Sequence, residues 1–373
     1  MKLLIDPQTY NEQRYGGISR YHTEVFVALQ KQGIEVDFPL VYSDNLHLKE
    51  YSISGRTWNY IANSKIFSRS VRRKIDKKLK QKNINNTIKA LQKQDFDVFV
   101  STYYNPYFVE YLNDKPFVLT LHDMIHEILP QYFTDDHITV ERKRALLHRA
   151  TRIIAVSHNT KKDILHFYPE LDAGKIDVVY LSQSIKIDQS VAVDLPGNYI
   201  LFVGNRTIYK NFIFFIRSIA PFLKDNPQLF VMCAGGNRFE PDEKQLLESL
   251  GISAQVMQRN FEDNELAAYY SNAKCFVFAS EYEGFGIPVL ESMACGCPVV
   301  LANHSSFPEV AGDAGVYFEL NNAEDLKMKV AQLVENEVLR NEYSKKGLLQ
   351  AEKFSWKKTA EDCLAVYKKA LAE

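Results

Sequence analysis

The chain has 373 residues, of which 46% are hydrophobic and 24% charged, and its formal net charge at pH 7 is −1. A chain of this length exceeds what a single hydrophobic core usually serves, so we expect two domains. The balanced charge gives no indication that the protein coats nucleic acid.

The cysteines and the N-terminus indicate the cellular compartment. Five cysteines, an odd number in mostly apolar contexts, predict reduced thiols in a cytosolic protein. Cys295 and Cys297 lack a second pair or a nearby histidine, so we expect packing rather than zinc, and no metal or cofactor. The opening MKLLIDPQ reaches a charge too early for a signal peptide, and Arg217 interrupts the longest apolar stretch. We therefore expect a cytoplasmic chain without a membrane-spanning segment.

In the first half, short β-branched or aromatic runs alternate with stretches of helical period. The runs predict strands at 2–6, 35–40, 97–101, 117–123, 152–157 and 175–181. Helices are predicted after Gly17, near Lys65 to Lys93, after Thr134 and after Asn159. This alternation predicts a mainly parallel sheet covered by helices.

The same pattern restarts after a polar, proline-containing stretch. Strands are predicted at 199–204, 229–235, 254–258, 274–280, 298–302 and 315–318, again separated by helices. We expect an N-terminal domain at 1–182, a linker at 183–197, a C-terminal domain at 198–355, and a final amphipathic helix at 356–373 that returns to the first domain. The predicted fold is α/β, with two Rossmann-like domains facing each other across a central cleft, which is the default ligand site.

The stretch SEYEGFGIPVLESMACGCPVV, residues 280–300, reads as the end of a strand, a glycine turn and a short helix. Glu283 lies in the turn, and Glu291 lies about two turns along a helix that begins near Gly286 and ends at Gly296. A carboxylate there can accept two hydrogen bonds from the vicinal diol of a ribose, and Gly284 lets backbone N–H groups approach an anion. The ordinary alternative is one glutamate that offsets the helix dipole and one that is solvated.

Together with FPEVAGDAG at 307–315, this stretch resembles the retaining glycosyltransferases of the large bacterial family 4, and the resemblance covers essentially the whole chain. It implies the two-domain GT-B fold and metal-free transfer from a nucleotide diphosphate-sugar. It also implies that Glu283 holds hydroxyls of the donor sugar and that Glu291 holds the ribose. The donor diphosphate would then meet the turn formed by Gly284, Phe285 and Gly286.

Two cations follow the first strand of the second half, in FVGNRTIYKNF at 202–212. Arg206 and Lys210 can neutralise the charge that grows on a departing diphosphate, whereas the alternative is two solvated loop cations. The resemblance implies the first role. It also places Arg259, Asn260 and Phe261 in the loop that lines the nucleobase.

The first half contributes a glycine pair and a histidine. Gly16 and Gly17 open a helix whose N-terminus can receive an anion, and they resemble the family's glycine loop near the donor phosphate. His122, at the end of the strand at 117–123, matches the family's histidine that approaches the donor sugar. Asp123 is expected to orient the loop or the imidazole rather than to attack the substrate.

With these features, the resemblance implies a retaining, metal-independent hexosyltransferase that extends a surface polysaccharide or a lipid-linked oligosaccharide. RTIYKNF and YEGFGIPVLE resemble members that use GDP-mannose. A sugar-nucleotide epimerase and a non-catalytic sugar-nucleotide sensor remain as alternatives. The Glu-x7-Glu spacing argues against the epimerase, and the intact set of Arg206, Lys210 and Glu283 argues against the sensor.

Cations crowd the segment from Lys65 to Lys93, where Asp76 is the only acid. Apolar residues at 66, 67, 71, 75 and 79 fall near helical spacing, as they do in a helix that lies on a membrane surface. One hypothesis is therefore docking on the anionic inner face of the cell membrane, and the alternative is a solvated helix face. No base-reading module accompanies the segment, so we do not expect nucleic acid as a partner.

Overall fold

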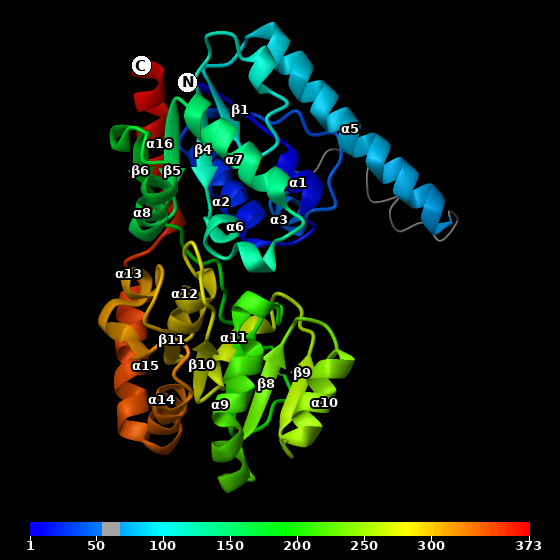
Figure 1. Ribbon diagram of the computed structural model, residues 1–373. Helices are drawn as coiled ribbons and strands as arrows, with labels where there is room; N and C mark the ends of the chain where they lie inside the picture. The colour runs from blue at the N-terminus through cyan, green and yellow to red at the C-terminus, as the bar shows by residue number, and fades with distance from the viewer. Residues whose placement is uncertain (54–67, 189, 192) are drawn as a thin grey trace. The chain divides into compact units, whose positions relative to one another are not determined.

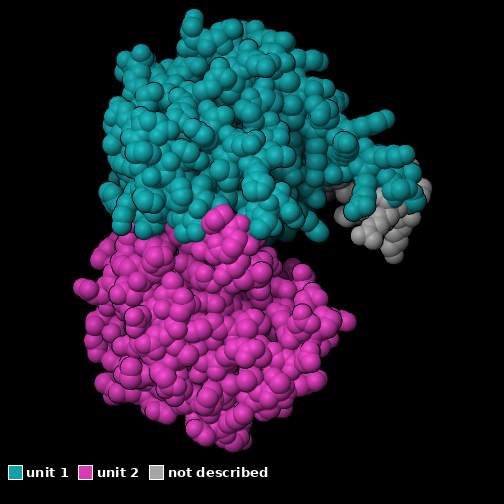
Figure 2. Space-filling view, viewed as in Figure 1, with its two compact units in different colours: residues 1–128, 133–181, 356–373 teal, residues 129–132, 182–355 magenta. Residues whose placement is uncertain are grey.

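The computed structural model describes residues 1–53, 68–188, 190–191 and 193–373. The chain forms two compact units, coloured separately in Figure 2. The first unit contains residues 1–128, 133–181 and 356–373, and the second contains residues 129–132 and 182–355.

The first unit is built on a six-stranded parallel sheet of order β2-β1-β3-β4-β5-β6. Its strands are β1 (Lys2–Ile5), β2 (Glu35–Asp37), β3 (Val98–Ser101), β4 (Phe117–Leu121), β5 (Arg152–Ala155) and β6 (Ile176–Val178). β3, β4 and β5 are buried along their whole length. Their continuous apolar runs are those expected of parallel strands that are covered on both faces.

Helices cover this sheet (Figure 1). They are α1 (Gln8–Glu12), α2 (Gly17–Lys31), α3 (Leu46–Glu50), α5 (Arg69–Lys93), α6 (Ile125–Ile128), α7 (His137–Arg149), α8 (His158–Phe167) and α16 (Trp356–Ala372). Side chains fix several helix starts: Ser68 caps α5, Asp136 caps α7 and Ser157 caps α8. The last helix, α16, packs on α2, β4 and β5.

The second unit repeats the plan with a parallel sheet of order β12-β11-β10-β7-β8-β9. Its strands are β7 (Tyr199–Val203), β8 (Phe230–Ala234), β9 (Val256–Arg259), β10 (Cys275–Phe278), β11 (Val299–Ala302) and β12 (Gly315–Phe318). β7 therefore lies between β10 and β8. The loop after β7 is therefore flanked by the loop after β10 on one side and the loop after β8 on the other.

The helices of the second unit are α9 (Phe212–Asp225), α10 (Pro241–Ser249), α11 (Leu266–Ser271), α12 (Ile287–Ala294), α13 (Phe307–Ala311), α14 (Ala323–Glu335) and α15 (Glu337–Ala351). The α/β class and all twelve predicted strands are confirmed. The five cysteines are buried and form no disulfide, as predicted. Among the described helices, none has both the length and the apolar character needed to cross a membrane.

Candidate active site

An ion pair joins two loops at the carboxyl edge of the second sheet. Lys210 ends the short 3-10 turn Ile208–Lys210 after β7, and Glu283 lies between β10 and α12. The Lys210 ammonium pairs with the Glu283 carboxylate, and each side chain is 18% exposed. The ammonium also lies 5.1 Å from the ring centroid of Phe278. The pair is thus partly shielded from water, at the edge where open parallel sheets bind ligands.

Two serines after β11 hold the backbone of the Glu283 turn. Ser305 Oγ donates to the Glu283 carbonyl at 2.6 Å, and Ser306 Oγ donates to the Phe285 carbonyl at 2.9 Å. The Phe285 side chain is buried, so any contact of this residue with a ligand would come from its backbone. The sequence analysis missed both serines, because a Ser-Ser pair in a loop looks like an ordinary turn.

α12 begins and ends where its sequence predicts. Gly286 precedes it with a φ of 97°, which favours glycine, and Gly296 follows it with a φ of 69°. Glu291, on this helix, is only 7% exposed, and the Tyr270 hydroxyl donates to its Oε2 at 3.4 Å. Burial, with the negative charge of Glu291 nearby, raises the pKa of Tyr270 well above its usual value. Glu291 is therefore not a solvated surface carboxylate.

Arg206 is held on the opposite side of β7 from Glu283. Its guanidinium donates to both carboxylate oxygens of Glu243 on α10, at 2.7 and 3.1 Å, and to the carbonyls of Gly235, Asn237 and Arg238. Its side chain is 4% exposed. Lys210 and Arg206 thus leave the same loop in opposite directions, one to the β10 side and one to the β8 side.

A glycine turn after β8 makes room for Arg206. Gly236 has a φ of 71°, and a Cβ there would lie 2.5 Å from the Gly204 carbonyl oxygen and 2.7 Å from an Arg206 nitrogen. The sequence analysis missed Glu243, the partner of this arginine. Glu243 forms a capping box with Glu240 at the start of α10, and that local motif was its only visible signal.

The three residues predicted to line the nucleobase lie at the end of β9. Arg259 bonds through its guanidinium to the backbone carbonyl of Asp194. The Asn260 side chain accepts a hydrogen bond from Gln258 at 3.0 Å. The Phe261 ring lies 3.2 Å from where a Cβ on Gly235 would stand. Phe261 therefore packs against the glycine turn that also holds Arg206.

In the first unit, His122 follows β4 and packs against α2. It is 8% exposed, its backbone N–H donates to the Tyr104 hydroxyl at 3.3 Å, and its ring lies 5.4 Å from that of Tyr21 and 5.6 Å from that of His22. Burial lowers the pKa of His122 to about 4, so the imidazole is neutral at pH 7. Within the described part of the chain, its Nε2 has no hydrogen-bond partner.

Gly17 is the first residue of α2, after the N-cap Gly16. The Gln13 side chain accepts a hydrogen bond from the Ser19 backbone N–H at 3.1 Å, so one of the donors at this helix N-terminus is already satisfied. A Cβ on Gly16 would stand 2.5 Å from the Gln13 side-chain oxygen. Gly17 and His122 thus belong to the first unit, whereas the other predicted site residues belong to the second.

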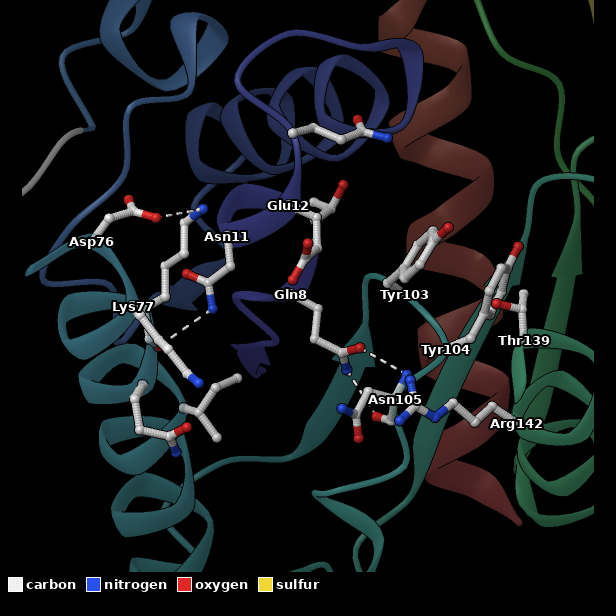
Figure 3. A pocket seen from close by; sticks show the side chains of 15 residues that line it. Gln8, Asn11, Glu12, Asp76, Lys77, Tyr103, Tyr104, Asn105, Thr139 and Arg142 are labelled. Carbon is white, nitrogen blue, oxygen red and sulfur yellow. Dashed lines mark hydrogen bonds and ion pairs between the residues drawn. The ribbon is translucent and has the colours of Figure 1, made fainter. Parts of the chain in front are cut away.

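A cavity of about 690 Å³ opens in the first unit between α5 and the loops after β1 and β3 (Figure 3). Gln8, at the start of α1, and Asn105, in the loop after β3, exchange hydrogen bonds of 2.7 and 2.9 Å at its wall. Lys77 of α5 and Arg142 of α7 supply positive charge, and Tyr104 extends the wall to His122. The carboxylates of Glu12 and Asp76 line it as well, so the mixture of amides, aromatic rings and charges of both signs suits a polar ligand.

No group of three or more His, Cys, Asp or Glu side chains placed to hold a metal ion occurs in the described ranges.

Two family descriptions match the chain in succession. "Glycosyltransferase Family 4" matches residues 15–181, and "Glycosyl transferases group 1" matches residues 183–350. The first match ends at residue 181, the last residue of the first unit before α16, and the second covers nearly all of the second unit.

Among similar proteins, the O-antigen chain mannosyltransferase B of Escherichia coli is 29% identical over 266 residues, which cover 67% of this chain and 70% of that protein. The N-acetylgalactosamine-N,N'-diacetylbacillosaminyl-diphospho-undecaprenol 4-alpha-N-acetylgalactosaminyltransferase of Campylobacter jejuni is 29% identical over 224 residues, 58% of this chain and 60% of that protein.

Solved structures match over the whole chain at low identity. Sucrose-phosphate synthase from Thermosynechococcus elongatus has a TM-score of 0.75 at 17% identity and covers 100% of this chain and 99% of its own. HepE from Anabaena, solved with UDP and glucose, has a TM-score of 0.70 at 16% identity, with 98% of each chain covered. These likenesses show the GT-B fold.

Proposed function

Since this chain belongs to the family 4 glycosyltransferases, and is thus a glycosyltransferase enzyme, we propose that it is a retaining, metal-independent hexosyltransferase. Its donor would be a nucleotide diphosphate-sugar, with mannose from GDP-mannose as the donor that we favour. Its acceptor would be a growing surface polysaccharide or a lipid-linked oligosaccharide. The mannosyltransferase of E. coli supports mannose, and the C. jejuni enzyme, named for an undecaprenol diphosphate, supports a lipid-linked acceptor.

The ion pair between Lys210 and Glu283 is the observation that carries this proposal. A cation and a carboxylate stand together on neighbouring loops at the carboxyl edge of the second sheet, beside the N-terminus of α12. When the donor binds, Lys210 would turn to the diphosphate and release Glu283 to accept hydrogen bonds from the sugar hydroxyls. As the glycosidic bond breaks, negative charge grows on the leaving diphosphate, and a fixed cation stabilises that charge most in the transition state.

We assign the other contacts by the same logic. The buried Glu291 would accept hydrogen bonds from the ribose, and the loop from Arg259 to Phe261 would line the base. Arg206 would keep the glycine turn after β8 in shape and add positive potential near the diphosphate. Gly17, at the N-terminus of α2, would face the donor phosphate with its helix dipole.

We propose the cavity of the first unit as the acceptor site. Its amides and tyrosines can bond sugar hydroxyls, and Lys77 and Arg142 can meet a phosphate. His122, which Tyr104 links to the cavity wall, would offer a neutral imidazole to the reacting sugar. α5, which lines the cavity, carries the cations that would bring the first unit to an anionic membrane.

The decisive experiment screens nucleotide sugars for thermal stabilisation of the protein, and then assays the best donor with candidate acceptors. We expect GDP-mannose to stabilise the protein, turnover that requires an acceptor and survives EDTA, and an α-linked product from an α-linked donor by NMR. Donor consumption without an acceptor would indicate the epimerase, and binding without any turnover would indicate the sensor. An inverted product or loss of activity in EDTA would contradict the retaining, metal-independent mechanism.

A further inference from the structure

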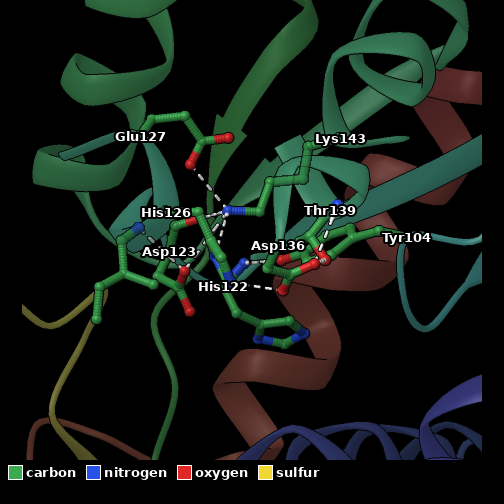
Figure 4. A network of polar contacts seen from close by, with 9 residues as sticks. Tyr104, His122, Asp123, His126, Glu127, Asp136, Thr139 and Lys143 are labelled. Carbon is green, nitrogen blue, oxygen red and sulfur yellow. Dashed lines mark hydrogen bonds and ion pairs between the residues drawn. The ribbon is translucent and has the colours of Figure 1, made fainter. Parts of the chain in front are cut away.

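A lysine with no exposed side-chain surface lies beside His122 in the first unit (Figure 4). The Lys143 ammonium, on α7, lies 3.0 Å from Glu127 Oε2, 3.7 Å from Asp123 Oδ1 and 3.4 Å from His126 Nδ1. It also donates to the backbone carbonyl of Asp123 at 3.2 Å. The ring centroid of Tyr104 lies 5.4 Å away. This buried charge is therefore surrounded by Asp123, by two residues of α6 and by the Tyr104 ring.

Stability alone does not account for this arrangement. Moving a lysine and a glutamate out of water costs several kcal/mol for each ion, and a well-packed apolar pair of the same size is often at least as stable. The Glu127 side chain is only 3% exposed, so both charges have lost most of their water. The pair instead fixes the orientation of the groups bonded to it, because hydrogen bonds hold the groups that they join in a defined geometry.

The polar groups that Lys143 joins belong to the loop residue Asp123 and to the short helix α6 that follows it. Asp123 follows His122 in the chain, and the lysine holds its carbonyl while the Asp123 carboxylate accepts a hydrogen bond from the Ile125 N–H at 3.2 Å. His126, one step further, is held from its other side by Asp136, the N-cap of α7, at 3.1 Å. α7 thus holds the Asp123 backbone carbonyl and the side chains of Asp123, His126 and Glu127, the last two on α6.

We propose that Lys143 is a positioning residue for the transfer reaction, which fixes Asp123 and the start of α6 and thereby the direction of the His122 imidazole. This inference rests on the proposed function, because it assumes that His122 meets the reacting sugar. The Nε2 of His122, for which the described residues offer no hydrogen-bond partner, is the atom that must point at the sugar. A shift of the loop backbone by a fraction of a hydrogen-bond length would move that atom away from a substrate hydroxyl.

The positive charge of Lys143 also affects His122 directly, by disfavouring protonation of the imidazole. The rings of Tyr21 and His22, both on α2, lie against the imidazole, and the charges of Asp123 and of Lys143 on α7 act on it electrostatically, while Tyr104, after β3, bonds to the backbone N–H of the same histidine. Burial is the main cause of the lowered pKa of His122, Asp123 opposes it, and Lys143 adds to it. Loss of the ammonium would therefore raise the pKa of His122.

The test uses the full chain with both buried charges removed, as K143M with E127Q, so that no unpaired Glu127 is left behind. We expect a folded protein whose kcat falls on the order of 10²-fold with the donor KM within about twofold, because a displaced catalytic group costs rate rather than donor affinity. The His122 titration midpoint, followed by NMR of labelled histidine, should rise. K143R should recover part of the lost kcat, since it restores the charge and the donor.

Lys161→Met is the matched control. Lys161 also donates to two backbone carbonyls of the first unit, those of Ala173 and Ile176, but not in the His122 loop. This variant should keep kcat and the His122 titration of the wild type. If H122A abolishes turnover while the folded K143M/E127Q protein keeps the wild-type kcat and titration midpoint, our inference about Lys143 is wrong and the proposed function stands. If H122A itself keeps full turnover, the role of His122 in the proposed function fails first.

Discussion

At the scale of single residues, the two cations after β7 have different surroundings and should respond differently to mutation. Lys210→Ala removes a partly exposed ammonium, so we expect a folded protein that loses turnover and binds nucleoside diphosphate more weakly. Loss of one such electrostatic contact typically costs about 3 kcal/mol of activation free energy. Arg206→Ala also strands the nearly buried Glu243, so the second unit should lose about 3 kcal/mol of stability as well.

Denaturant unfolding and steady-state kinetics on the two variants separate these effects. Restored stability in R206A/E243Q, with turnover still low, would assign Arg206 a part in the reaction. Recovery of both stability and turnover in this double variant would show that Arg206 has a structural role only. Wild-type turnover of K210A at saturating donor would remove Lys210 from the mechanism.

Mutation of the two glutamates in the Glu-x7-Glu spacing should also have different effects. In the proposed function Glu283 leaves Lys210 for the sugar, so Glu283→Gln should impair turnover far more than it impairs binding of the nucleoside diphosphate. Glu291 is buried on α12, so Glu291→Gln should weaken nucleotide binding itself. Calorimetry with the nucleoside diphosphate tests this division, and equal losses of affinity in both variants would contradict it.

His122 makes stability depend on pH in a defined direction. Its pKa is about 4 when folded and near 6.5 when unfolded, so the unfolded chain takes up a proton first as the pH falls. Titration of His122 should therefore lower the free energy of unfolding of the wild type by roughly 3 kcal/mol between pH 6.5 and 4. Burial raises the pKa of the Asp6 carboxyl to about 7, so its protonation increases the free energy of unfolding as the pH falls, opposite to the effect of His122. The measurement is thus a difference: H122N should lose less stability than the wild type on acidification, and parallel pH profiles would refute the assignment.

At the scale of elements, α5 is the helix whose function its sequence leaves most open. Ser68 caps its start, and residues 65–67 of the predicted membrane segment lie outside the described residues. Val71 is 39% exposed, and Arg72, Arg73, Lys77 and Lys78 are exposed around it. In Figure 1 the first half of α5 extends beyond the sheet of its own unit. The cations and Val71 are therefore available to a surface, whereas Ile75 and Leu79, further along the predicted apolar stripe, are half-buried.

Liposome co-sedimentation tests whether α5 docks on membranes. Each cation near an anionic leaflet contributes about 1 kcal/mol, so binding should need anionic lipid and fade with salt. It should drop when Arg72, Arg73, Lys77 and Lys78 become glutamate. The same four changes on neutral vesicles serve as the control, because neither protein should sediment there. A wild type that stays in the supernatant with anionic vesicles at low salt would favour a soluble acceptor.

At the scale of the whole molecule, the chain completes its first unit with its last helix. Cys363, Val366 and Tyr367 of α16 are all buried, and the Tyr21 hydroxyl of α2 lies 3.3 Å from Cys363 Sγ. Arg152 of β5 also pairs with Glu373 at 2.8 Å. The first unit therefore depends on residues that are synthesised after the entire second unit.

Tyr367→Ala should accordingly destabilise the first unit and spare the second. Truncation of a fully buried aromatic side chain costs about 3 to 5 kcal/mol. Hydrogen exchange resolved by segment should show faster exchange in β4, β5 and α2, with β7 and β10 unchanged. Leu371→Ala, at a position that is 44% exposed, is the control. Equal acceleration in both units would mean that they unfold as one.

The local pattern of the sequence was enough for the elements and for the family. The period of apolar residues predicted twelve strands, and glycines 286 and 296 marked both ends of α12, because strand pairing, helix period and left-handed φ values depend on residues that are close in the chain. Only the tertiary structure decided the partners of the charged side chains. Lys210 pairs with Glu283, and Arg206 with Glu243, because β7 lies between β10 and β8. In the sequence VERKRALL, Lys143 looks like a solvated lysine. It is buried because α7 packs over the segment after β4. Such pairings join residues far apart in sequence, so their energies depend on strand order and helix packing rather than on any local spacing.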